Sequence, residues 1–116
     1  MAREKLPNRR LSITRVLQTD NDKYYVSFGV DPQDITPKEV FVKGSKIGSD
    51  MDMLLDDASV VLSLALQYGV PVDQLIHSLD TGREDGAKSV LARGIAMIGE
   101  EIENVRKEIT SSGNPL

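Results

Sequence analysis

The chain has 116 residues, 40% of them hydrophobic and 28% charged, with 18 acidic against 14 basic side chains. This length suits one globular domain, because a second would need roughly another 50–100 residues. The lack of cysteine excludes a disulfide framework, a thiolate metal site and thiol chemistry carried by this chain. A net charge of -4 argues against nucleic acid as a partner. With no secretory signal and no membrane-spanning run, we expect a soluble cytoplasmic protein without a membrane partner.

The first residues differ in charge from the rest of the chain. Residues 1–18 hold five basic side chains against the single acid Glu4. Pro7 lacks an amide hydrogen and favours an extended Leu6. We therefore predict a flexible basic arm over residues 1–9, one domain over residues 10–110 and a frayed tail over residues 111–116.

Alternating apolar residues predict three strands, at about residues 10–18, 23–30 and 38–43. The alternation is clearest at Tyr24, Val26, Phe28 and Val30. The polar residues 19–22 are typical of a hairpin turn whose Asx side chains satisfy backbone amides. We expect a three-stranded antiparallel sheet with one apolar face that other elements must cover.

Three helices are predicted to provide this cover, at about residues 50–68, 72–79 and 86–109. Ser49 is a suitable N-cap with Asp52 three residues later, while Gly69 and Pro71 end the first helix. The helices should pack on one face of the sheet. The predicted fold class is therefore α+β.

Two helical segments expose more apolar surface than a small sheet can shelter. Residues 60–66 are apolar nearly all round, and the last helix carries apolar residues spaced 4, 3, 4, 3, 4 along a heptad seam. The seam could be buried against the middle helix of its own chain or against a second copy. We favour a homodimer or larger assembly. The predicted interface residues are Val60, Val61, Leu64, Leu91, Ile95, Ile98, Ile102 and Val105.

The connection from the third strand to the first helix has the composition of an anion site. Free amides at a helix N-terminus attract phosphate, and two lysines add positive charge. The alternative is a plain connection whose glycines supply positive φ and whose amides are capped by Ser49 and Asp50. The candidate ligand residues are Lys43, Gly44, Ser45, Lys46, Gly48 and Ser49.

Other polar residues give weaker signals. Asp50, Asp52, Asp56 and Asp57 cluster at the helix start, and Asp52 and Asp56 could share a divalent cation, but no third ligand follows at helical spacing. A solvated acidic face is the favoured explanation, because the acids at the helix start already complement the helix dipole. His77 is the only histidine, and no nucleophile motif accompanies it. We expect no catalytic residue, no metal ion and no cofactor.

Several runs along the chain are distinctive: Leu6-Pro7-Asn8-Arg9-Arg10, Glu39-Val40-Phe41, Gly44, Lys46, Gly48-Ser49-Asp50 and Ser63-Leu64-Ala65-Leu66-Gln67-Tyr68-Gly69-Val70-Pro71 with Leu75. Through these runs, about residues 6–110 resemble the TSCPD domain. That domain occurs at the C-terminal end of adenosylcobalamin-dependent (class II) ribonucleotide reductases and in short stand-alone bacterial proteins. The Thr-Ser-Cys-Pro-Asp run is absent, and Asp85-Gly86-Ala87-Lys88-Ser89-Val90 occupies its place, so a thiol role does not transfer.

These observations leave competing hypotheses. The resemblance implies a non-catalytic accessory or regulatory module, related to ribonucleotide reductase or nucleotide metabolism, that assembles through its helices. The alternative is a small-ligand binding protein that holds a nucleotide or phosphorylated metabolite at residues 43–50, with Arg9 or Arg10 converging on it. An enzyme acting through Asp50, Asp52 and His77 ranks third. Binding of DNA by the arm ranks last, because the acidic body would oppose it.

Overall fold

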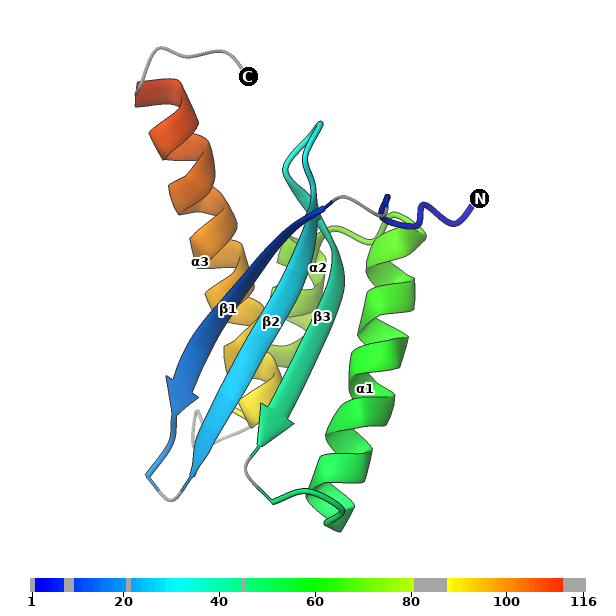
Figure 1. Cartoon of the computed structure of the whole chain (residues 1–116), viewed down its shortest axis with the longest axis vertical. Coiled ribbons are helices and arrows are strands. Elements are labelled where there is room, and N and C mark those ends of the chain that lie inside the picture. Colours follow the sequence, from blue (N-terminus) through cyan, green and yellow to red (C-terminus); the bar gives the residue numbers. More distant parts are fainter. Residues whose placement is uncertain (1, 8–9, 21, 45, 81–87, 112–116) are drawn as a thin grey trace.

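A computed structural model describes residues 2–7, 10–20, 22–44, 46–80 and 88–111. Three antiparallel strands are followed by three helices, which confirms the predicted α+β class (Figure 1). The last helix begins at residue 90 instead of 86; residues 81–87 lie outside the described ranges. The elements are β1 Leu11–Gln18, β2 Lys23–Asp31, β3 Thr36–Gly44, α1 Asp50–Gln67, α2 Val72–Asp80 and α3 Val90–Ser111.

The sheet is a meander in the order β1-β2-β3, because each strand returns beside the one before it. In the first hairpin the Asp22 amide donates to Thr19 Oγ1 at 3.0 Å, and the Thr19 amide donates to the Asp22 carbonyl at 2.8 Å. A threonine hydroxyl therefore satisfies a turn amide for which we expected Asx side chains. In the second hairpin Asp31 accepts from the Gln33 amide at 2.9 Å.

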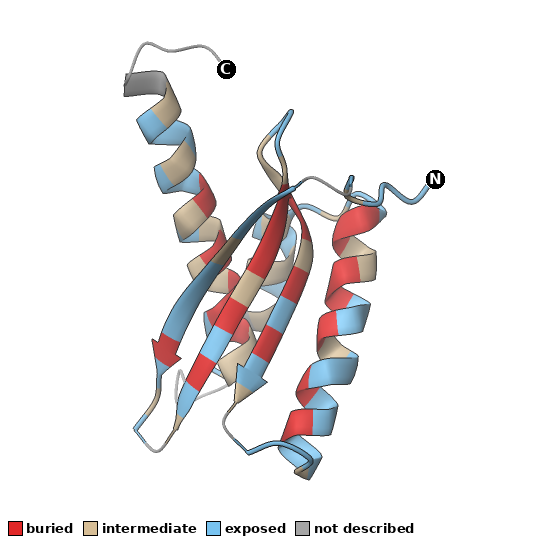
Figure 2. Ribbon diagram, viewed as in Figure 1, coloured by how far each residue is buried: buried red, intermediate tan, exposed pale blue. Residues whose placement is uncertain are grey.

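The core lies between one face of the sheet and the helices (Figure 2). Val26, Phe28 and Val40 on this face are fully buried, as are Ile95 and Ile98 of α3. In Figure 1, α3 runs behind the sheet with α2 packed on it, and α1 stands beside β3. The opposite sheet face is open, with Val16, Tyr25 and Phe41 between 43% and 49% exposed. The domain is therefore a two-layer structure with one uncovered sheet face.

Helix α1 is attached to the edge of β3 by side-chain hydrogen bonds to the strand backbone. Ser63 Oγ accepts from the Val40 amide at 3.0 Å and donates to the Val40 carbonyl at 3.2 Å. One turn earlier, Ser59 Oγ accepts from the Val42 amide at 3.1 Å. One turn later, Gln67 Nε2 donates to the Lys38 carbonyl at 3.0 Å. Residues four apart lie on one helix face, so a single polar stripe bonds four main-chain groups along the edge of β3.

The described part of the predicted arm, residues 2–7, is extended and lies against the domain. The Glu4 amide donates to the Gln67 carbonyl at 2.8 Å, at the C-terminal end of α1. The Glu4 carboxylate pairs with Lys38 Nζ at 3.0 Å. Leu6 lies over Gly29, where an added Cβ would sit only 2.7 Å from Leu6 Cδ1. The arm therefore links the end of α1 to the open sheet face.

Candidate functional site

The loop between β3 and α1 caps its own helix. Gly48 has φ +81°, a conformation that glycine adopts without steric cost. Ser49 is the N-cap: its Oγ accepts from the Asp52 amide at 3.1 Å and donates to the Lys46 carbonyl at 2.9 Å. Asp52 Oδ2 in turn accepts from the Gly48 amide at 2.9 Å. This confirms the predicted capping pair, and it places a carboxylate where an anion would have to bind.

The charge of Lys43 is also used within the chain. Its Nζ lies 2.8 Å from Asp56 Oδ1 and 3.3 Å from Asp52 Oδ1. The hydrogen bond to Asp56 raises the pKa of Lys43, with a further contribution from Asp52. The Gly48 amide, and then Lys43, lower the pKa of Asp52. Asp52 and Asp56, which we considered as ligands for a cation, converge on this ammonium group.

A hollow of about 400 Å³ lies beside the loop. Gly44 leaves room for the ring of Tyr24, because an added Cβ would lie 2.9 Å from Tyr24 Cε1. Three aspartates and one lysine are among the lining residues, so the hollow is unfavourable for a phosphate. Arg10 does not line it and pairs with Glu39 at 3.1 Å; Arg9 and Ser45 lie outside the described residues. The lining residues are Asp22, Tyr24, Gly44, Lys46, Ser49, Asp50, Met51, Asp52 and Leu55.

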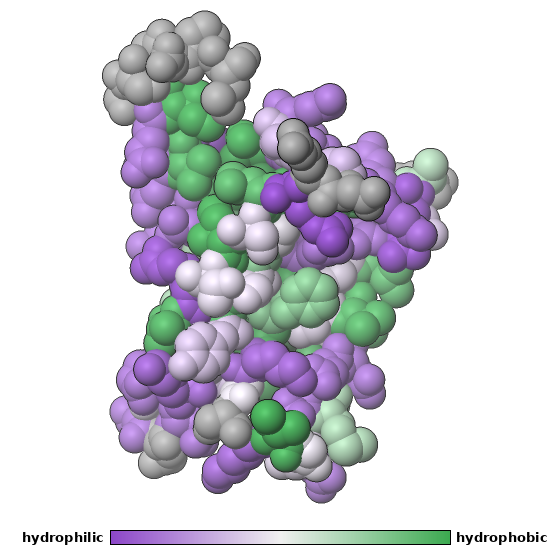
Figure 3. Space-filling model, in the orientation of Figure 1, coloured by the Kyte–Doolittle hydropathy of each residue, from purple (hydrophilic) through white to green (hydrophobic). Residues whose placement is uncertain are grey.

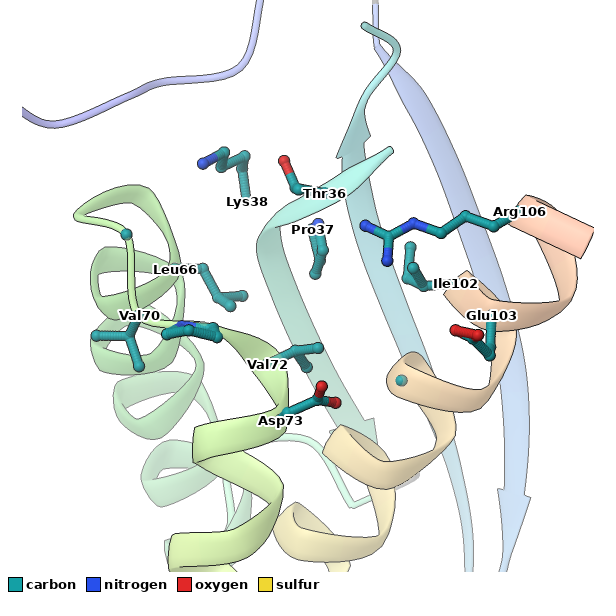
Figure 4. Close-up of a pocket in the computed structure, with 13 residues that line it drawn as sticks. Thr36, Pro37, Lys38, Leu66, Val70, Val72, Asp73, Ile102, Glu103 and Arg106 are labelled. Carbon is teal, nitrogen blue, oxygen red and sulfur yellow. The ribbon is translucent and has the colours of Figure 1, made fainter. Parts of the chain in front are cut away.

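A second hollow, of about 320 Å³, lies between the start of β3, the end of α1, the start of α2 and the middle of α3 (Figure 4). Lys38 and Arg106 line it together with the acids Asp73 and Glu103. Arg106 Nη2 donates to the Ile35 carbonyl at 3.1 Å. Sequence reasoning missed this hollow because its wall is assembled from four elements. Its cations and acids are balanced, so it shows no preference for a charged ligand.

The residues considered for catalysis are not brought together in either hollow. Asp50 and Asp52 line the loop hollow, whereas His77 is exposed on α2 and lines neither. Within the described ranges, no group of three His, Cys, Asp or Glu side chains is placed to hold a metal ion. Among the same residues, every buried side-chain nitrogen and oxygen has a hydrogen-bond partner. Neither hollow therefore presents a recognisable catalytic constellation.

The predicted interface residues fall into two groups. On α1, Val60 and Val61 are 56% and 64% exposed, and Leu64 is partly buried. On α3, Ile95, Ile98 and Ile102 are at most 3% exposed, while Leu91 and Val105 are partly buried. The sheet and α2 thus cover the centre of the seam within one protomer, and only Val60 and Val61 among the predicted interface residues are exposed. Assembly itself stays a prediction.

No helix in the described ranges combines the length and apolar character needed to cross a bilayer.

A family model and several known proteins match most of this chain. The TSCPD domain family model matches residues 2–105. The vitamin B12-dependent ribonucleotide reductase of Rhodopirellula baltica is 33% identical over 81 residues, covering 70% of this chain and 8% of the reductase. The enzyme of the same name from Streptomyces clavuligerus is 28% identical over 107 residues, covering 92% of this chain and 11% of the reductase. The comparison with solved structures found no significant match.

The chain spans about a tenth of the length of these curated relatives, so the likeness concerns one module of a large enzyme. The family match runs from the N-terminal segment through most of α3. This agrees with the resemblance inferred from the strand-to-helix loop and the end of α1. The chain therefore belongs to the TSCPD domain family and is related through this domain to the vitamin B12-dependent ribonucleotide reductases.

Proposed function

We propose that this protein is a non-catalytic accessory or regulatory module of ribonucleotide reduction that assembles through its helices. The observation that carries the proposal is the extent of the match: almost the whole chain corresponds to about a tenth of a reductase. The chain contains no cysteine, so it cannot supply thiol chemistry. A module of this kind would act by binding.

The distribution of polar groups supports a binding role over a catalytic one. Lys43 is held by two aspartates, and Arg10 and Lys38 are each paired with a glutamate. Several large apolar side chains, by contrast, are exposed on α1 and on the open sheet face. Exposed apolar surface that extends over neighbouring elements is typical of association sites.

The proposal is tested by binding and activity measurements with a vitamin B12-dependent ribonucleotide reductase, such as that of Rhodopirellula baltica. We expect the full chain to bind the reductase in biolayer interferometry and to change its turnover or its response to nucleotide effectors. The chain alone should show no reductase activity. Reductase activity of the isolated chain would contradict the proposal. So would an absence of both binding and any effect on turnover at about 100 µM chain, a concentration at which even weak partners associate.

The contacts of residues 43–50 give no support to the alternative, a nucleotide or phosphorylated metabolite bound at this loop. The capping carboxylate of Asp52 occupies the amide of Gly48, and Lys43 is already neutralised. We expect a thermal-shift screen with nucleotides and sugar phosphates to leave the melting temperature unchanged. Stabilisation that is lost in Lys46→Ala would instead favour the ligand-binding alternative.

A further inference from the structure

The outer side of α1, facing away from β3, carries a second heptad-like seam. Its residues are spaced 3, 4, 3, 4 along the helix, which is the spacing that lines up side chains for pairing with another helix. Leu54 and Val61 are each 64% exposed. On the flank, Met53 and Val60 are 58% and 56% exposed. The seam consists of Leu54, Asp57, Val61, Leu64 and Tyr68.

This seam is distinct from the side of α1 that holds the sheet. Leu55, Ser59 and Leu62 are buried on that side, so the two faces of the helix have different tasks. In Figure 3 apolar residues interrupt the hydrophilic surface on the right-hand side, where Figure 1 places α1. The helix therefore offers apolar surface that none of the described residues of its own protomer covers.

The size of the seam suits a helix pair between two copies. Its exposed apolar side chains, with the flanking Met53 and Val60, present roughly 500 Å², whereas each partner in a stable interface buries about 600–800 Å². The polar residues beside the seam can supply the remainder. A patch of this size is at the upper end of what a typical monomer leaves exposed.

Charge fixes the orientation of such a pair. The N-terminal part of α1 is acidic, with Asp50 and Asp57 on the outer side. The last turn of α1 itself holds no basic residue, and Arg3 of the arm donates to the Gln67 side chain on the side of the helix that faces β3. In a parallel pair, Asp57 would face its own copy. In an antiparallel pair, the acidic N-terminal ends of the two helices lie apart, and the helix dipoles oppose each other.

We propose that α1 packs antiparallel against α1 of a second copy, across a two-fold axis that passes near Val61. This rests on the assembly in the proposed function and names its surface and geometry. With a rise of 1.5 Å per residue, the two copies of Asp57 lie about 12 Å apart measured along the helix axis. Leu54 meets Tyr68 of the second copy at each end of the seam. The contact is isologous, so it closes as a dimer.

The surface is tested by sedimentation equilibrium of the full chain over a concentration series. We expect a dimer whose dissociation constant rises at least about 100-fold in Val61→Glu, because the axis brings the two introduced charges together. Val16→Glu is the matched control, since Val16 is also exposed but lies on β1. It should leave the dimer unchanged. Circular dichroism spectra of both variants check that the fold is kept.

The orientation is tested by cross-linking, which the cysteine-free sequence makes simple. Val61→Cys should form a disulfide-linked dimer under mild oxidation, because the axis places the two sulfurs together. Leu54→Cys should not form this disulfide, because its two copies lie about 21 Å apart measured along the helix axis. Efficient cross-linking of Leu54→Cys would overturn the antiparallel arrangement.

Other outcomes separate this inference from the proposed function. A dimer that persists in Val61→Glu would overturn the α1 seam while leaving assembly intact. A chain that remains monomeric at every concentration would overturn both the seam and assembly through helices. Binding of the reductase is measured separately and does not depend on either result.

Discussion

Replacing Ser63 by alanine tests whether α1 is held to the sheet edge by its hydroxyl groups. The side chain bonds both the amide and the carbonyl of Val40, and Ser63 is only 8% exposed. The substitution leaves two buried backbone groups without partners, at about 1–3 kcal/mol each. Allowing for some local relaxation, we expect a loss of about 3 kcal/mol, a large share of the 5–15 kcal/mol typical of a domain.

The loss is measured by urea unfolding followed by circular dichroism, at one fixed protein concentration because association would add to the apparent stability. Ser59→Ala removes a single bond, to the Val42 amide, and should cost about half as much. Ser12→Ala, on the exposed side of β1, is the control and should change stability by less than about 0.5 kcal/mol. A Ser63→Ala variant as stable as this control would refute the edge attachment.

Three further predictions follow from other contacts. Asp52→Asn should flatten the acid limb of the stability curve: the folded-state pKa lies below the ordinary 3.8, so the stabilisation is present above that pH and is lost as the pH falls through the folded value. Acid titration with a fluorescent or circular dichroism readout decides this, and an unchanged limb would contradict it. Gly29→Val should displace Leu6 and speed trypsin cleavage within residues 2–7, with the core intact; equal cleavage rates would argue against the packed arm. Gly94→Ala should raise the unfolding free energy by about 1 kcal/mol, because the added methyl meets a β2 valine at an ordinary 3.4 Å; a lower melting temperature would show that the space is too tight.

The strands and the helix ends could be predicted because their signals are local. Alternating side chains mark β2 whatever it packs against, and Ser49 and Asp52 cap α1 through neighbours three residues apart. The cover of the α3 seam could not be predicted, because a heptad pattern identifies the buried side of a helix but not what buries it. The sheet does so here, where Gly94 lets α3 approach Val26 closely.

The attachment of α1 to the edge of β3 was difficult to predict for a different reason. Residues 60–66 are apolar apart from Ser63, and this apolar run masks the regular polar spacing of Ser59, Ser63 and Gln67. These side chains bond main-chain atoms of β3, and such bonds leave no mark on the residue types of the strand. Their four-residue spacing, on a helix that directly follows an edge strand, was the signal available.

The contacts of the 43–50 loop could be predicted only in part. The sequence predicted a glycine with positive φ and a serine N-cap, and the structure shows these at Gly48 and Ser49. The pairing of Lys43 with Asp52 and Asp56 depends on how β3 lies against α1, which spacing along the chain does not give.

The two edge strands of the sheet, β1 and β3, differ in how their outer backbone groups are bonded. Side chains of α1 already bond main-chain groups of Lys38, Val40 and Val42 at the outer edge of β3, so a foreign strand cannot add there without first displacing the helix. Any lengthening of the sheet, by a partner segment or by the first step of aggregation, must therefore proceed from β1. Arg15 sits on that strand in an ion pair with Glu101, and a charged residue at such a margin discourages uncontrolled growth. A new strand can therefore join the sheet only beside β1, where a charged side chain opposes uncontrolled addition.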